Sequence, residues 1–161
     1  YFRVDERLLG APERANRPAL PQGLMPVPRL NVGASDGGGA LTEDDQTEAV
    51  FAFDPRWLRR LSGSPQQLAL IQVEGESMLP TLAHGDDIMV DPSDAGERLR
   101  AGIYVLRRDG MLLVKRVQPT AGKPGHADIV SDNQAFPSDA AVPLAGLVIV
   151  GRVIWSGRKI N

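Results

Sequence analysis

A tight turn at Asp109-Gly110 constrains the fold of this chain more than any other stretch of its sequence. Asp-Gly suits a two-residue hairpin turn of type I′, because both central residues of that turn need a positive φ. The turn therefore predicts antiparallel pairing of the β-rich segments on either side of it, with Tyr104 directly opposite Lys115.

The two faces of this hairpin differ in polarity. One face is apolar apart from Lys115 and the tip residue Arg108, whereas the other carries Arg107 and Arg116, which favour water. The apolar residues of the first face are Tyr104, Leu106, Leu113 and Val117. We therefore expect the first face to be buried and Lys115 to be buried with it.

Short β-rich segments separated by turn residues make up most of the chain from Leu68 onward. They lie at 68–73, 88–90, 103–107, 112–117, 128–130 and 147–155, and two earlier strands are expected at 27–32 and 48–53. One short helix is expected at about residues 54–61, since Asp54 can cap it, Pro55 suits its first position and Gly63 can end it. Phe53 and Leu58 have the spacing of a hydrophobic staple. The sequence thus predicts a mostly β fold.

Composition limits the possible functions. The 161 residues are enough for one compact domain and a tail, and the formal net charge of −2 gives no broad attraction for nucleic acid. There is no cysteine, which excludes disulfides and thiolate metal sites, and with two scattered histidines we expect neither a metal nor a cofactor. No apolar segment approaches the roughly 18 to 20 residues that a membrane span needs.

Ser77 and Lys115 are the candidate catalytic residues. Ser77 lies where a strand-like segment breaks at Gly75 into a turn, which can present its hydroxyl outside the sheet. A buried lysine has a lowered pKa, so its neutral amine can act as a general base for a serine nucleophile. The alternatives are an ordinary turn serine and a Lys115 that extends its amine to water at the strand edge.

Several segments together resemble the LexA-like serine peptidase domain, the C-terminal half of LexA and of many phage repressors. The resemblance covers about 68–160. It is carried by Gly75-Glu76-Ser77-Met78-Leu79-Pro80-Thr81-Leu82 with Gly85-Asp86, Gly102-Ile103-Tyr104-Val105, Leu113-Val114-Lys115-Arg116, Ser131-Asp132-Asn133 with Pro137, and Gly151-Arg152-Val153-Ile154-Trp155.

This resemblance implies short, highly twisted antiparallel strands and a Ser-Lys dyad, with Ser77 as nucleophile and Lys115 as base. The backbone amides of Glu76 and Ser77 are the implied oxyanion donors. The implied protein is a cytoplasmic, bacterial or phage-encoded homodimeric repressor that cuts its own hinge. The implied trigger is the RecA–single-stranded-DNA filament formed after DNA damage.

The resemblance also suggests a domain organisation. Residues 1–26 are expected to be a linker from a helix-turn-helix domain that contacts operator DNA, and the proline-rich composition suits a linker. Residues 27–47 are expected to form the hinge with the cleavage segment, and residues 48–161 the peptidase and dimerisation domain.

The candidate scissile bond departs from the family pattern. The family usually cuts Ala-Gly, sometimes Cys-Gly, but the best-aligned bond here is Asp36-Gly37. A carboxylate entering an apolar cleft costs desolvation, and it favours a protonated Lys115. Cleavage at this bond is therefore expected to be slow, displaced or lost.

Other residues carry weaker signals. His84 and His126 are expected to lie in a turn and a loop, and Asp86 and Asp87 to cap a turn. The apolar segment 147–154 could pair across a two-fold axis, although an interior strand has the same pattern.

Two further functions remain open. The first is a catalytically silent domain that only dimerises or senses a partner. The second is a signal peptidase, which has a similar serine block but normally carries a membrane anchor and a larger region after the lysine.

Overall fold

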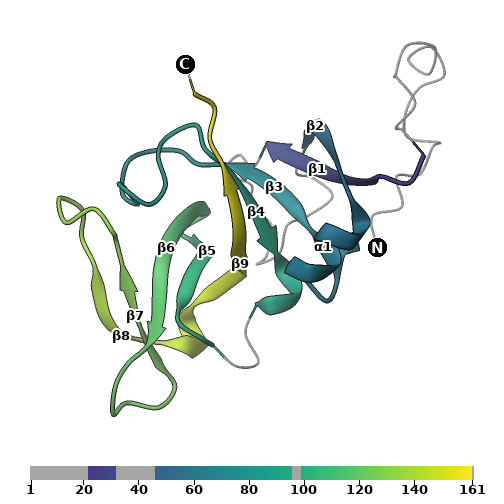
Figure 1. Ribbon diagram of the computed structural model, residues 1–161. Helices are drawn as coiled ribbons and strands as arrows, with labels where there is room; N and C mark the ends of the chain where they lie inside the picture. The colour runs from purple at the N-terminus through teal and green to yellow at the C-terminus, as the bar shows by residue number, and fades with distance from the viewer. Residues whose placement is uncertain (1–21, 32–45, 96–98, 161) are drawn as a thin grey trace.

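The computed structural model describes residues 22–31, 46–95 and 99–160. Within these ranges the chain forms a nine-stranded sheet in the order β2-β1-β3-β4-β9-β5-β6-β7-β8 (Figure 1). The strands are β1 (Met25–Asn31), β2 (Gln46–Phe53), β3 (Ala69–Gln72), β4 (Asp87–Asp91), β5 (Gly102–Arg108), β6 (Met111–Pro119), β7 (His126–Val130), β8 (Asp139–Pro143) and β9 (Val148–Gly157). The helix is α1 (Pro55–Leu61), and three single 3₁₀ turns are η2 (Pro65–Gln67), η3 (Pro92–Asp94) and η4 (Leu144–Gly146). The expected mostly β fold is confirmed.

Strand β9 joins the two halves of the sheet, as Figure 1 shows. Its first half pairs with β5 and its second half with β4, and Arg152 pairs with both. The expectation of antiparallel strands alone is wrong in one place, because β1 pairs with β3 in parallel. Strand β8, which the sequence did not predict, forms by antiparallel pairing with β7.

The β5–β6 hairpin has the expected register, with Tyr104 opposite Lys115. Asp109 and Gly110 have φ values of 51° and 76°, as the type I′ turn requires. The first face is buried at Tyr104 and Leu106, as expected. The second face, expected to meet water, is covered too: Val105 is fully buried and even Arg107 is only 8% exposed.

Helix α1 begins and ends close to the expected residues. The Asp54 carboxylate accepts a hydrogen bond from the Arg56 N–H at 2.7 Å, and Pro55 occupies the first turn. The helix ends because Ser62 is extended, one residue before the expected Gly63. Phe53 stacks on Trp57, with ring centroids 5.5 Å apart.

Two apolar clusters cover opposite faces of the β3–β4 pair. Ile71 and Ile88, which are paired, belong to the first cluster together with Met78 and Leu82. Their neighbours Leu70 and Met89 belong to the second cluster, which contains Leu58 of α1. Because side chains alternate along a strand, α1 covers one face and the turn that carries Ser77 covers the other.

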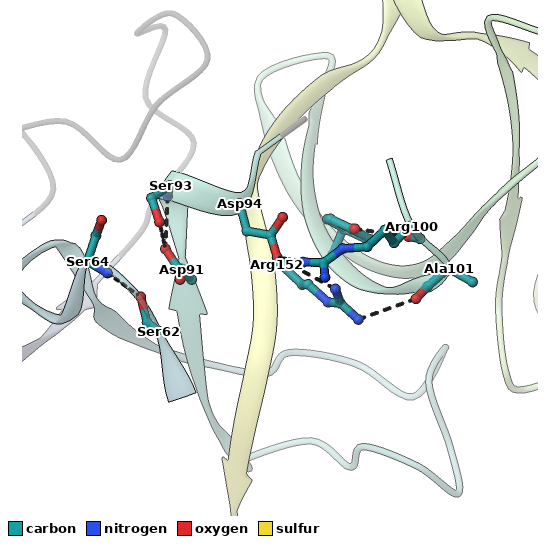
Figure 2. Close-up of polar contacts among 9 residues, drawn as sticks. Ser62, Ser64, Asp91, Ser93, Asp94, Arg100, Ala101 and Arg152 are labelled. Atoms are coloured by element: carbon teal, nitrogen blue, oxygen red, sulfur yellow. Dashed lines mark hydrogen bonds and ion pairs between the residues drawn. The ribbon is translucent and has the colours of Figure 1, made fainter. Parts of the chain in front are cut away.

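Polar contacts connect the end of β4 to β9 (Figure 2). Arg100 donates to the Asp94 carboxylate at 2.6 Å, and Arg152 of β9 lies 3.6 Å from the same carboxylate. Arg152 also donates to the Ala101 carbonyl at 3.4 Å. Asp91 caps η3 by accepting from the Ser93 N–H at 2.9 Å. These contacts fix β9 where it passes from one half of the sheet to the other.

Gly151 is expected to be essential for packing at this junction. A Cβ there would lie 2.7 Å from Val90 Cγ1 and 2.8 Å from the Asp91 carbonyl oxygen, and the backbone cannot give way cheaply. Gly151→Ala should therefore lower the free energy of unfolding by about 1–3 kcal/mol, measured by urea denaturation. Gly146→Ala is the matched control, because its Cβ meets no atom within 4 Å. Equal stabilities of the two variants would contradict this account of the junction.

Candidate functional site

Ser77 lies in a closed turn between β3 and β4. The Val73 N–H donates to the Asp86 carbonyl at 2.8 Å, and the Gly85 N–H donates to the Val73 carbonyl at 2.9 Å. Gly75 and Gly85 have φ values of 81° and 89°, which suit glycine. Met78 and Leu82 anchor the turn, since they are only 1% and 3% exposed. The serine next to this anchor is half-buried.

An ion pair locks the end of the turn. Asp86 is buried and accepts two hydrogen bonds from the exposed Arg158, at 2.8 and 2.6 Å, and one from the Ala83 N–H at 2.8 Å. The hydrogen bond from Arg158 lowers the pKa of Asp86 from its ordinary value of 3.8, burial opposes this shift, and the Ala83 N–H adds to it. Asp86 therefore stays ionised and ties the serine turn to the residues after β9.

A groove of about 580 Å³ runs past Ser77. Residues 111–114 of β6 form one side, and the other lining residues are Leu30, Asn31, Glu48, Ile71, Gln72, Val73, Glu74, Gly75, Ser77, Met78 and Val105. Within the described residues, β7 pairs with β6 only from Arg116 onward. The backbone of residues 111–115 is therefore open on this side, and an extended peptide could pair with it.

Lys115 lies on β6, immediately beyond the groove-lining residues. Its half-buried position lowers the pKa of the amine from the ordinary value of 10.5, and the Asp139 carboxylate partly opposes this effect. The amine donates a hydrogen bond to the Ser131 hydroxyl oxygen at 2.7 Å. The Ser131 hydroxyl itself donates to the Pro137 carbonyl at 2.7 Å, so it can only accept from Lys115. The lone pair of a neutral Lys115 amine is therefore left free.

Residues 131–133, which we call the bridge, hold the serine turn against β6. At one end Ser131 accepts from Lys115. At the other end Asn133 donates to the Ser77 carbonyl through its N–H and to the Glu76 carbonyl through its side chain, both at 3.0 Å. Ser77 and Lys115, far apart in the sequence, are thus bonded to the same three-residue segment.

Asp132, at the centre of the bridge, strengthens this link. It accepts two hydrogen bonds from Arg116 of β6, at 2.8 and 2.7 Å, and one from the Thr81 hydroxyl of the serine turn at 2.6 Å. The bonds from Arg116 lower the pKa of Asp132, burial opposes this effect and the Thr81 hydroxyl adds to it. An ionised Asp132 thus connects the serine turn to β6, because it accepts from Thr81 of the turn and from Arg116 of the strand.

The structure does not bring the two candidate catalytic groups into direct hydrogen bonding. Within the described residues Lys115 bonds to Ser131, and the Ser77 hydroxyl makes no hydrogen bond. The peptide N–H groups of Glu76 and Ser77, the candidate oxyanion donors, likewise make none with this part of the chain. The candidate scissile bond, Asp36-Gly37, lies outside the described residues.

The other polar residues singled out in the sequence also have hydrogen-bond or ion-pair partners. His84 accepts from the Gly75 N–H at 3.2 Å and so helps to close the serine turn. A ring nitrogen of His126 lies 3.0 Å from the Pro124 carbonyl. Asp87 lies 3.4 Å from Arg29 of β1. Across the described ranges, no group of acidic, histidine or cysteine side chains is placed to hold a metal ion.

Sequence reasoning missed the roles of the bridge and of Arg158. Ser131, Asp132 and Asn133 contribute to the resemblance, but their roles depend on contacts with residues distant in the sequence. Arg158 gave no signal, because its partner Asp86 lies 72 residues away in the sequence.

The family comparison supports a peptidase domain of the LexA-like, repressor type, in agreement with the mostly β fold. The chain belongs to the Peptidase S24-like family, whose model matches residues 30–154. A search of curated proteins finds no match to this chain. None of the helices in the described ranges has the length and apolar character of a membrane span.

The Asp86–Arg158 pair predicts how acid destabilises the site. Because the folded state lowers the pKa of Asp86, its contribution to stability is complete above the unfolded value of 3.8 and is lost as pH falls through the lower folded value. Asp86→Asn should cost about 1–3 kcal/mol at pH 7, since buried hydrogen bonds are lost. The variant should also lose less stability than the parent below about pH 4.

Urea denaturation from pH 7 to pH 2 measures both effects. Arg108→Gln is the control, because its pair with Asp139 is exposed and should change stability by less than about 1 kcal/mol. A neutral outcome for Asp86→Asn at pH 7 would show that this pair does not hold the turn.

Proposed function

We propose that this domain is a self-cleaving serine peptidase of a LexA-like transcriptional repressor, with Ser77 as nucleophile and Lys115 as general base. The observation that carries the proposal is the bridge. It bonds to the Lys115 amine at Ser131 and to the Ser77 carbonyl at Asn133, so the two groups are fixed to one short segment at one end of a groove. A serine in a turn unrelated to Lys115 would need no such segment.

The proposed chemistry uses the free lone pair of Lys115. The neutral amine rotates about its flexible stem and takes the Ser77 proton as the hydroxyl oxygen attacks the peptide carbonyl. The N–H groups of Glu76 and Ser77 donate to the oxyanion that forms. The ammonium then protonates the leaving amine, and the amine base next activates a water molecule that hydrolyses the acyl-enzyme.

The proposed substrate is the segment of the chain between β1 and β2. Leu30 and Asn31 at the end of β1 and Glu48 near the start of β2 line the groove. Described residues on both sides of the segment 32–45 therefore lie at the groove that contains Ser77. An extended segment of 14 residues can reach out and back by about 20 Å. Within it, Asp36-Gly37 is the proposed bond.

The repressor role extends this proposal. The homodimer would bind operator DNA through an N-terminal helix-turn-helix domain, and cleavage would separate that domain from the dimer and end bivalent binding. The RecA–single-stranded-DNA filament formed after DNA damage is the proposed trigger. Residues 153–157 of β9 support dimerisation, because among the described strands they pair only with β4 and leave a backbone edge for a second copy.

A catalytically silent sensing or dimerisation domain is the second candidate. It is favoured by the bond of Lys115 to Ser131 rather than to Ser77. The same contact is compatible with a resting peptidase, since catalytic hydrogen bonds often form only with the substrate in place. Activity measurements decide between the two.

Alkaline incubation of the purified chain tests the dyad. Self-cleavage should appear as two fragments on a gel and increase with time. Ser77→Ala and Lys115→Ala should each slow it by about 10³-fold or more, because neither the nucleophile nor the base can be replaced by its neighbours. Ser156→Ala and Lys123→Ala are the matched controls and should cut like the parent. An intact parent chain after prolonged incubation would favour the silent domain.

The pH dependence of cleavage should follow Lys115. Burial lowers the pKa of the amine and Asp139 raises it, and the amine acts only when deprotonated, so the rate should rise with pH to a midpoint below 10.5. Asp139→Asn removes the opposing charge, so the midpoint should move to lower pH. Asp54→Asn, on the face covered by α1, should leave it unchanged. An unshifted Asp139→Asn profile would mean that another group sets the rate.

A further inference from the structure

The groove has a one-sided charge distribution. Its charged lining residues in the described part of the chain are Glu48 and Glu74, and no arginine or lysine lines it. Glu48 forms an ion pair with Arg29 at 3.2 Å, and the same guanidinium lies 3.4 Å from Asp87. Glu74 is exposed and forms no ion pair within the described residues. Glu74 is therefore a groove-lining residue whose carboxylate has no ion-pair partner among the described residues.

Glu74 is close to the proposed chemistry. It lies three residues before Ser77, between β3 and the glycine that starts the serine turn, on the side of the groove opposite the open edge of β6. A peptide that pairs with residues 111–114 and presents a carbonyl to Ser77 must pass along this wall. Its side chains on that side are therefore within reach of the Glu74 carboxylate.

We propose that Glu74 determines specificity by selecting against acidic side chains, and for neutral or basic ones, in the peptide that enters the groove. The inference rests on the proposed peptidase function. Like charges in a partly shielded groove repel, whereas opposite charges attract. Glu74 thus acts against cleavage at Asp36-Gly37, separately from the desolvation of Asp36 and from its effect on Lys115.

A charge-swap series in the intact chain tests the assignment. Cleavage rates are measured for the parent Asp36 chain and for the variants Asp36→Asn and Asp36→Lys. Each of these three chains is made with the parent Glu74, with Glu74→Gln and with Glu74→Lys. In chains that keep Glu74, the Asp36→Lys variant should cut itself fastest and the parent Asp36 chain slowest. Each step should change the rate by about two- to fivefold, the range of one exposed charge pair. Glu74→Gln should make these steps smaller and Glu74→Lys should make them smaller still, leaving the part of the difference that comes from Asp36 itself.

The double-mutant comparison isolates the contact between the two positions, since effects of Asp36 on Lys115 are common to all three backgrounds. Salt is a second readout. In 1 M salt, where charges are screened beyond about 3 Å, the dependence on Glu74 should vanish. Asp54→Asn is the control for loss of one surface carboxylate on the opposite face, and it should leave the order unchanged.

Binding distinguishes failure of this inference from failure of the proposed function. The Ser77→Ala chain is titrated with extended ten-residue peptides that carry Asp, Asn or Lys at the central position. Weaker binding of the Asp peptide, which Glu74→Lys partly restores, supports the inference even if no variant cuts itself. The inference would be overturned if the ratios of cleavage rates and of peptide affinities were the same whichever residue stands at position 74. If none of the variants cut itself, only the peptidase proposal would be overturned.

Discussion

The contact on which the site depends most is the one between Asp132 and its donors on two separate elements. Arg116 of β6 and Thr81 of the serine turn bond to the same carboxylate. Without it, the bridge would link the turn to β6 only through the hydrogen bonds at its two ends, that of Ser131 with Lys115 and those of Asn133 with the Glu76 and Ser77 carbonyls. An ionised Asp132 therefore fixes the geometry of the site, whereas the apolar clusters stabilise the domain.

Ser77 and Lys115 are held to different degrees. Ser77 is part of a rigid turn, closed by two glycines, anchored by Met78 and locked by Asp86. Lys115 has a flexible stem, and its amine rests on a neighbouring hydroxyl. The Lys115 amine therefore moves more easily than the Ser77 hydroxyl. Breaking its hydrogen bond to Ser131 costs little free energy, because the amine can form an equivalent hydrogen bond elsewhere.

Local features of this fold could be predicted from the sequence, and features set by distant contacts could not. The Asp109-Gly110 turn and the Asp54 cap act over a few residues, so the hairpin register and α1 were predicted correctly. Burial of both hairpin faces and the parallel β1–β3 pair depend on elements far along the chain, which local patterns do not specify. At the site, Ser77 and Lys115 stood out by type and context, whereas Ser131, Asp132 and Arg158 matter only through partners 16 to 72 residues away.

The place of β9 has a consequence for the newly made chain. The serine turn belongs to the β1–β4 half and the lysine to the β5–β8 half, and the last strand in the sequence joins them. Pairing between β4 and β9 closes a long loop, which makes it a late step in folding. A partly synthesised chain that carries both residues therefore still lacks the sheet that brings them together. The arrangement of the two residues thus depends on a strand that follows both of them in the sequence.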